Sequence, residues 1–368
     1  MEVKRESPIL RQIFPAALSF LGLLALILDA ETAVRAAGEG LTMCLQTVVP
    51  SLFPFLVASR LFAGSAAAGW CARVLGPVMG PVFGLPPQCA PALVLGAVSG
   101  YPVGAQTAAG LYAQGRLDRQ SSERLLSFCS NAGPAFLFGM VGGLLGGVRI
   151  AAILYVIHLI SAILTGIVLK PRRGCRCPER VVCGPTGGKT DLTTAVSGGV
   201  RTMGLICGYI VLFQVISAFL EKALGLWLPP MGQALLAGFL ELAGGCCRLP
   251  QIESAGIRYC MASGFLAFGG LCVFLQTLSV IRPAGLTGRY YLFGKMIQSA
   301  IAVLLTWGAM VLFPGALPRA VTATAMPLPN HSGLLRATGV VTAIFLSTLG
   351  IWCLRLRKRA GKQTASDV

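Results

Sequence analysis

Residues 99–106 read Ser99-Gly100-Tyr101-Pro102-Val103-Gly104-Ala105-Gln106, and they interrupt an apolar segment that spans about residues 88–112. A second interruption, Asn131-Ala132-Gly133-Pro134-Ala135-Phe136, lies in the next apolar segment. Helix breakers and hydrogen-bonding side chains are tolerated at membrane depth only where the broken backbone is buried in protein or lines a water-filled cavity. The two motifs therefore favour a membrane protein that handles a solute.

The composition of the chain is that of a membrane protein. Of its 368 residues, 55% are hydrophobic and 12% are charged, whereas an average globular chain carries about 25% charged residues. The 46 glycines fit the same class, because small residues let membrane helices approach one another closely. We expect the lipid bilayer as the surrounding medium and no separate globular domain.

The net charge of +17 does not indicate a nucleic-acid partner. A nucleic-acid-binding protein gathers Lys and Arg on one folded face with aromatic side chains between them. Here the basic residues lie between apolar runs, as in the cytoplasmic loops of membrane proteins. The basic tail at residues 355–359 is expected to lie beside anionic lipid headgroups.

Apolar runs of about 20 residues mark candidate membrane crossings. They lie at residues 12–28, 41–63, 88–112, 125–147, 149–169, 202–222, 232–250, 257–281, 291–313 and 335–354. If all were simple crossings and the N-terminus were cytoplasmic, the densest basic cluster, residues 172–189, would lie outside, against the positive-inside rule. The conflict disappears if the segments 88–112 and 232–250 each enter and leave on the same side.

The predicted fold is an all-α polytopic membrane protein with about eight transmembrane helices plus two re-entrant or broken segments. Both termini and the loops 113–124, 170–201 and 282–290 are then cytoplasmic, and 29–40, 223–231 and 314–334 face out. The chain divides into an N-terminal helix (1–40), a first half (41–169), a basic cytoplasmic loop (170–201), a second half (202–313) and a C-terminal helix with a basic tail (314–368).

In the predicted topology the two halves repeat one series, a span, a re-entrant segment and two spans, starting from opposite sides of the membrane. Phe128-Cys129-Ser130-Asn131-Ala132-Gly133 aligns with Tyr259-Cys260-Met261-Ala262-Ser263-Gly264. Inverted repeats with interrupted segments at matching positions are typical of secondary transporters, whose site lies near the midplane between the halves. A shared glycine-rich composition would also produce this likeness.

Three runs of the first half resemble a known family: Pro50-Ser51-Leu52-Phe53-Pro54-Phe55 and the motifs at 99–105 and 131–136. They are similar to sporulation integral membrane proteins of the YlbJ type, which carry a nucleoside-recognition (Gate) domain, and the likeness covers about residues 40–315. The resemblance implies a polytopic cell-membrane protein of spore-forming bacteria that is made in the mother cell and required for spore cortex formation, with a domain related to the gates of nucleoside and ferrous-iron transporters. Together with the repeat, it predicts two Gate-like halves. At the matching place the second half has Glu241-Leu242-Ala243-Gly244-Gly245, which differs from the first-half motif. Whether the second half contributes to a site therefore stays open.

The two interruptions form the candidate substrate-binding site. A broken helix exposes free N–H groups at one half-helix end and free carbonyls at the other, and polar side chains beside them can bind a nucleoside-like solute. The candidate residues are Ser99, Gly100, Tyr101, Pro102, Gly104, Gln106, Asn131, Gly133, Pro134 and Glu241. The other interpretation is that Gly and Pro only shape a hairpin tip while Tyr101 anchors at the interface.

Glu241 is the acidic residue well inside an apolar stretch, residues 233–243. A charge there costs at least ~2.5–3.5 kcal/mol on insertion scales, so protonation, a water-filled cavity or a partner such as Arg248 must offset it. Two interpretations stay open: a cation- or proton-coupling carboxylate that faces the first-half motif, or one half of a structural ion pair.

The remaining chemistry-bearing residues suggest no enzyme and no cofactor. Cys175, Cys177 and Cys183 cluster in a polar loop without the paired spacing of zinc sites, so free thiols are expected and a metal-passing role is the alternative. His158 stands alone in an apolar run and is expected to hydrogen-bond a neighbouring helix. Residues 184–190 miss the phosphate-loop spacing by one position.

The sequence thus predicts a protein that binds or transports a small polar solute in support of spore envelope assembly. The alternative, motivated by the imperfect second half, is a non-transporting scaffold or partner of the cortex-assembly machinery. Besides lipid and solute, the expected partners are a second copy of the chain or other sporulation membrane proteins.

Single cysteines in a cysteine-free background test the predicted topology. We expect Asp118, Arg180 and Thr287 to be labelled, when replaced by Cys, only from the cytoplasm, and Leu228 only from outside, because the re-entrant segments return the chain to the side from which it came. Gly104 should be reached through a cavity. Labelling of positions 118 and 180 from outside would make both segments ordinary spans.

Overall fold

The computed structural model of the chain describes residues 8–63, 65–170, 191–225, 227–313, 315 and 317. These residues contain helices and no strand. Five helices are long and apolar enough to cross a membrane, or up to six if one bent pair is a single span. The described part of the chain is therefore all-helical and multi-pass, as the sequence predicts, and the figure of about eight spans stays a prediction. The predicted span 335–354, the basic tail, the 184–190 loop and the three loop cysteines lie outside the described residues.

The elements follow one another without long connections in each half. In the first half and the N-terminal part they are α1 (Pro8–Leu28), α2 (Ala30–Met43), η1 (Cys44–Val48), α3 (Val49–Ala63), α4 (Ala66–Val78), η2 (Met79–Phe83), η3 (Pro87–Cys89), α5 (Ala90–Ser99), α6 (Val103–Ala113), α7 (Arg119–Leu126), α8 (Pro134–Phe136), η4 (Leu137–Val141), α9 (Gly142–Leu145) and α10 (Val148–Val168). In the second half they are α11 (Leu192–Leu224), α12 (Pro230–Leu240), α13 (Leu242–Arg248), η5 (Leu249–Gln251), α14 (Ala255–Phe268), α15 (Gly270–Ile281), η6 (Arg282–Ala284) and α16 (Arg289–Leu312).

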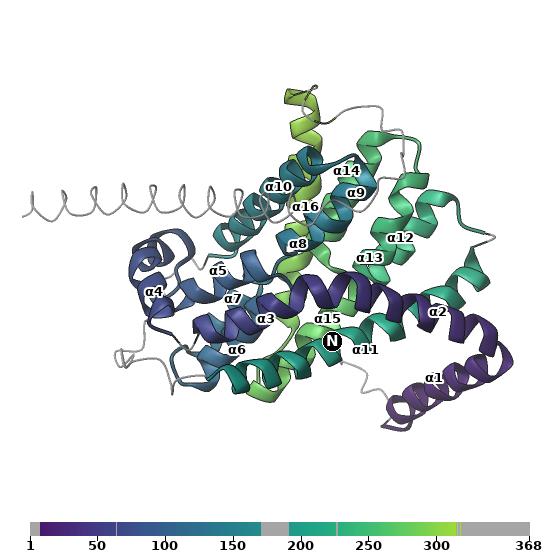
Figure 1. The fold of residues 1–368 in the computed structure, drawn as a ribbon, viewed down its shortest axis with the longest axis horizontal. Coiled ribbons are helices and arrows are strands. Elements are labelled where there is room, and N and C mark those ends of the chain that lie inside the picture. Colours follow the sequence, from purple (N-terminus) through teal and green to yellow (C-terminus); the bar gives the residue numbers. More distant parts are fainter. Residues whose placement is uncertain are drawn as a thin grey trace, which may run out of the picture.

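A long helical run made of α2, η1 and α3 packs antiparallel to α11 across the lower part of Figure 1. Lys222 pairs with Asp29 at 2.6 Å at one end of the pair, and Arg60 donates to Thr202 at 2.9 Å towards the other. The Lys222 ammonium also holds the pKa of the Asp29 carboxyl below its usual range. Above this pair in the same view, α10, α14 and α16 pack together.

Two of these helices begin earlier than the sequence predicts. The helix α2 lies in the predicted outward loop 29–40, and α11 begins inside the predicted loop 170–201. In each case an aspartate caps the helix N-terminus: Asp29 accepts from Thr32 N, and Asp191 accepts from Thr194 N. A cap of this kind satisfies backbone N–H groups that the first turn leaves free, so the helix begins at the cap and not at the first apolar residue.

The segments 88–112 and 232–250 are each broken into two helices that pack against one another. The first break separates α5 from α6 at residues 100–102, and the second separates α12 from α13 at Glu241. A glycine pair closes each hairpin: a Cβ on Gly104 would lie 2.9 Å from Gly96 Cα, and a Cβ on Gly245 would lie 2.3 Å from Gly238 Cα. Both segments are therefore broken, as the sequence predicts.

Two further segments counted as spans are also interrupted. The segment 125–147 is interrupted at the predicted 131–136 motif, and the segment 257–281, which remains one candidate span (Ala255–Ala284), is interrupted at a glycine that was not predicted. In the segment 125–147, α7 ends at Leu126 and helix resumes only at Pro134, which has no N–H to donate into a preceding turn. In the segment 257–281, Gly269 has φ +82° and separates α14 from α15, because a left-handed residue ends an α-helix. The bent pair Ala66–Phe83 and Pro87–Ser99, which meet at 109°, was not predicted at all.

Loops that the predicted topology places on the same side of the membrane contact one another in the structure. Glu123 accepts from Thr287 N at 3.1 Å and from its hydroxyl at 3.0 Å, which brings the loops 113–124 and 282–290 together. The Asp29–Lys222 pair likewise brings the start of 29–40 next to 223–231. The arrangement is consistent with the predicted sidedness, and which side is cytoplasmic stays a prediction.

Each of the three buried apolar clusters of the described residues contains side chains from both halves. One of them extends from Tyr101 and Ala132 in the first half to Leu242 and Tyr259 in the second. On the outside, large apolar side chains such as Val168, Leu304 and Leu312 are more than half exposed, as lipid-facing residues are in a membrane protein. The breaks thus lie inside the protein, not against lipid.

The close approach inside the first hairpin gives a stability prediction. A Cβ on Gly104 would lie 2.1 Å from the carbonyl oxygen of Cys129, whereas a Cβ on Gly110 of the same helix would have no atom within 4 Å. We expect Gly104→Ala to destabilise the protein by at least about 1–3 kcal/mol. Gly110→Ala should be neutral or stabilising, because alanine is the better helix former. Thermal unfolding in detergent measures both, and equal unfolding temperatures would contradict the packing described.

Candidate functional site

The two motifs of the first half lie in direct backbone contact. Gly100 has φ +85°, and a Cβ there would lie 3.0 Å from Gly133 N. A Cβ on Gly133 would in turn lie 3.1 Å from Gly100 Cα. Only glycine allows both the left-handed conformation at residue 100 and this approach. The tip of the α5–α6 hairpin therefore meets the break between α7 and α8.

The second half repeats this arrangement with different residues. A Cβ on Gly270 would lie 3.1 Å from the carbonyl oxygen of Leu240 and 3.2 Å from Glu241 Cα. The tip of the α12–α13 hairpin thus meets the break between α14 and α15, as the tip of the first hairpin meets the break before α8.

Tyr101 connects the breaks of the two halves. Its hydroxyl donates to the carbonyl oxygen of Leu266 at 3.0 Å, and its ring lies beside Gly269, whose Cβ would be 3.5 Å from Tyr101 Cζ. Since Gly270 contacts Glu241, the four breaks form one continuous chain of contacts across both halves. Tyr101 is buried against the second half, which is not the position of an interface anchor.

Lys295 of α16 lies against the first-half break and was missed in the sequence analysis. The side chain is fully buried, and its ammonium donates to the carbonyl oxygen of Ser130 and, at 2.7 Å, to Gln298 Oε1. It also lies 5.2 Å from the centre of the Tyr101 ring. The signal was present in the sequence, because Lys295 is the charged residue of the span 291–313 and an ionisable residue inside a membrane span is a candidate functional residue.

A hydrogen-bond network extends from Lys295 into the 131–134 motif. Gln298 Nε2 donates to Asn131 Oδ1 at 2.9 Å, and Asn131 Nδ2 donates to the carbonyl oxygen of Phe128 at 2.9 Å. His158 Nε2 accepts from Ala132 N at 3.0 Å, so His158 bonds a neighbouring segment. Two buried atoms in the network have no hydrogen-bond partner among the described residues, Ser130 Oγ and His158 Nδ1. Buried polar atoms are rarely left unpaired, which distinguishes these two atoms from the rest of the network.

The other predicted residues are divided between this network and its surroundings. Ser99 and Pro102 are buried on either side of the Gly100–Tyr101 turn, and Pro134 opens α8. The Tyr101–Pro102 peptide bond is cis. Gln106 points elsewhere: its amide donates to Thr202 of α11 at 3.4 Å.

Glu241 caps the helix that follows the second break. Its carboxylate accepts from Ala243 N at 2.9 Å and from Gly244 N at 2.5 Å. Arg248 does not form an ion pair with Glu241; it pairs with Glu221 and donates to the carbonyl oxygen of Gly244 at 2.9 Å. The amides at the N-terminus of α13 therefore supply the stabilisation that the sequence analysis assigned to a partner such as Arg248.

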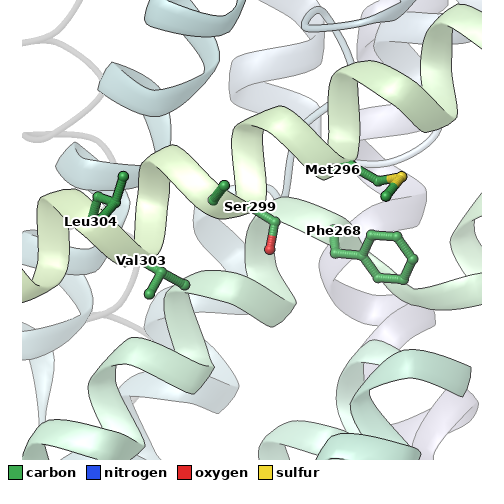
Figure 2. Close-up of a pocket in the computed structure, with 6 residues that line it drawn as sticks. Phe268, Met296, Ser299, Val303 and Leu304 are labelled. Carbon is green, nitrogen blue, oxygen red and sulfur yellow. The ribbon is translucent and has the colours of Figure 1, made fainter.

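A groove on the outer face of α14 and α16 is separate from this network. Figure 2 shows its lining, which comprises Phe268, Met296, Ser299, Ala300, Val303 and Leu304. The Ser299 hydroxyl is already bonded to the carbonyl oxygen of Gly264 at 3.0 Å, so the groove is almost entirely apolar. It suits a lipid chain and not a polar solute.

The link between Asn131 and Gln298 can be measured with a double-mutant cycle. We expect Asn131→Ala and Gln298→Ala to be coupled by about 0.6–1.7 kcal/mol in unfolding free energy, the range of hydrogen bonds between membrane helices. Asn131→Ala and Gln233→Ala serve as the control pair, because Gln233 bonds Gly225 and Leu228 instead. A coupling near zero for the first pair would contradict the network.

Comparison with known proteins finds a family model and a curated relative. Residues 45–169 match the family model described as Nucleoside recognition (Gate). The chain is 26% identical over 331 residues to the sporulation integral membrane protein YlbJ of Bacillus subtilis (strain 168), an alignment that covers 78% of this chain and 81% of that protein. No solved structure matches the chain. The chain is therefore a multi-pass integral membrane protein with a Gate domain in its first half, and a distant homologue of YlbJ.

Proposed function

We propose that this protein binds or transports a small polar solute with the hydrogen-bonding chemistry of a nucleoside, at the junction of the four helix breaks. The observation that carries the proposal is the contact chain from Gly133 through Gly100 and Tyr101 to Gly269, Gly270 and Glu241. Breaks of this kind place free backbone donors and acceptors inside the protein, where a solute can reach them once the halves move apart. The role is binding or transport, not catalysis.

The architecture that we propose for this role is a pair of inverted repeats with about eight spans and cytoplasmic termini. The matched hairpins support it, because the facing glycines Gly96 and Gly104 correspond to Gly238 and Gly245. The long helical run α2–α3, which α4 separates from its hairpin, corresponds to α11, and the span α10 corresponds to α16. In such repeats, one half moves against the other around a fixed site.

The name of the relative and the description of the Gate family set the biological context of the proposal. The relative is called a sporulation protein, and the family model is described as nucleoside recognition. We extend both to this chain: it acts in the membrane of a sporulating cell and supports formation of the spore cortex through the solute that it handles. In the alternative, the fold serves the cortex machinery as a scaffold and carries no solute.

Uptake by vesicles that contain the purified protein distinguishes these two roles. We expect accumulation of at least one member of a nucleoside panel, and about fivefold weaker binding in Ser130→Ala, since a hydrogen bond contributes about 1 kcal/mol. The substitution should leave thermal stability unchanged, because Ser130 Oγ has no protein partner among the described residues.

Ser263→Ala is the matched control for Ser130→Ala. The Ser263 hydroxyl is buried and bonded to Thr306 at 2.5 Å, so its loss should lower stability without a specific loss of solute binding. If the wild-type vesicles accumulate nothing and no nucleoside raises the unfolding temperature, the scaffold role is the better account.

A further inference from the structure

Lys295 is surrounded by neutral groups that stabilise a cation. Its ammonium donates to a backbone carbonyl, that of Ser130, and to a side-chain amide oxygen, that of Gln298. The ring faces of Tyr101 and Tyr291 lie 5.2 and 5.7 Å from it. The ion pairs in the described part of the chain are Arg119–Glu123, Lys222–Asp29 and Arg248–Glu221, so no described carboxylate pairs with Lys295.

Groups of this kind can also bind a free monovalent cation. Carbonyl and amide oxygens can replace the hydration shell of such an ion, and aromatic faces attract it through their quadrupoles. The carbonyl of Ser130 belongs to unwound backbone between α7 and α8. Unwound carbonyls at helix breaks are where transporters with interrupted helices coordinate a coupling ion. In this protein the position is filled by the chain's own ammonium.

The position of Lys295 also joins the two halves. The lysine lies on α16 of the second half, and Ser130 and Tyr101 belong to the two broken segments of the first half. Gln298, one turn further along α16, bonds both Lys295 and Asn131. A cation at this point therefore holds the first-half breaks against the second half.

We propose that the Lys295 ammonium is a tethered cation that fills a monovalent-cation site of this fold. The protein then needs neither Na⁺ nor K⁺ to assemble this junction. Removal of the side chain beyond Cβ leaves a buried space with the shape of propylammonium, lined by the oxygens of Ser130 and Gln298 and by the two tyrosine rings. The inference concerns the resident charge and does not depend on the identity of any solute.

Thermal unfolding of the purified full-length protein in detergent tests the proposal without a solute. Wild type, Lys295→Ala, Lys295→Arg, Lys295→Met and the control Lys222→Ala are compared in choline chloride, NaCl, KCl and propylammonium chloride at one ionic strength. Lys222 is the matched control because it is a lysine that is paired with Asp29 and exposed. We expect wild type, Lys295→Arg and Lys222→Ala to unfold at a temperature that is the same in all four salts.

Lys295→Ala should unfold at a lower temperature in choline and recover by several degrees, saturably, in propylammonium or in one of the alkali salts. Lys295→Met, which fills the space without a charge, should be less stable than Lys295→Arg in every salt. A specific Na⁺ or K⁺ dependence of the wild type would overturn the proposal. A Lys295→Met variant as stable as wild type would also overturn the proposal. This comparison can be made even if Lys295→Ala does not fold.

Discussion

The structure depends on the satisfaction of broken backbone inside a membrane protein. Lipid offers no hydrogen-bond partners, so a helix can be interrupted only where other protein groups cover the free amides and carbonyls. Here the tip of each hairpin lies against the break of the following helix, at Gly100 with Gly133 and at Glu241 with Gly270. Side chains bond the free backbone groups beside these contacts: Tyr101 donates to the carbonyl oxygen of Leu266, and His158 accepts from Ala132 N. The glycines are required because any side chain would hold these backbones apart. The hairpins, the interrupted spans and the shared core all follow from this contact.

Two buried ionisable residues are stabilised at the breaks in opposite ways. Glu241 receives the amide donors that begin α13, and Lys295 receives the carbonyl and amide oxygens beside the α7–α8 break. Each charge is therefore matched by uncharged dipoles and not by a buried ion pair, which would need both partners to be desolvated. Arg248 is then free to pair with Glu221. The polar groups at the centre of the protein are the free amides and carbonyls at the helix ends and the side chains that hydrogen-bond to them.

Much of the candidate site could be predicted from the sequence, because Gly, Pro and isolated polar residues are conspicuous in an apolar run. A break in each of the segments 88–112 and 232–250 was predicted, and so was the buried position of the first-half motif. Lys295 was missed although its signal was equally local, and Gly269 was missed because one more glycine does not stand out among 46. The early starts of α2 and α11 were missed because the helix bounds were taken from the length of the apolar runs. The N-cap residues Asp29 and Asp191 set where these helices begin.

The sequence by itself determined which residues can lie in lipid, that the segments 88–112 and 232–250 are broken, and that such breaks must be buried, because hydropathy and backbone hydrogen bonding act locally. Only the tertiary structure decided that the breaks meet one another and that the Tyr101 hydroxyl bonds the carbonyl oxygen of Leu266. It also decided that Arg248 pairs with Glu221, while Glu241 accepts from the backbone amides of α13. These contacts join segments far apart in the chain, and Tyr101 and Leu266 are separated by 165 residues. They depend on how the halves pack, and a pattern along one segment carries no information on the segment that will cover it.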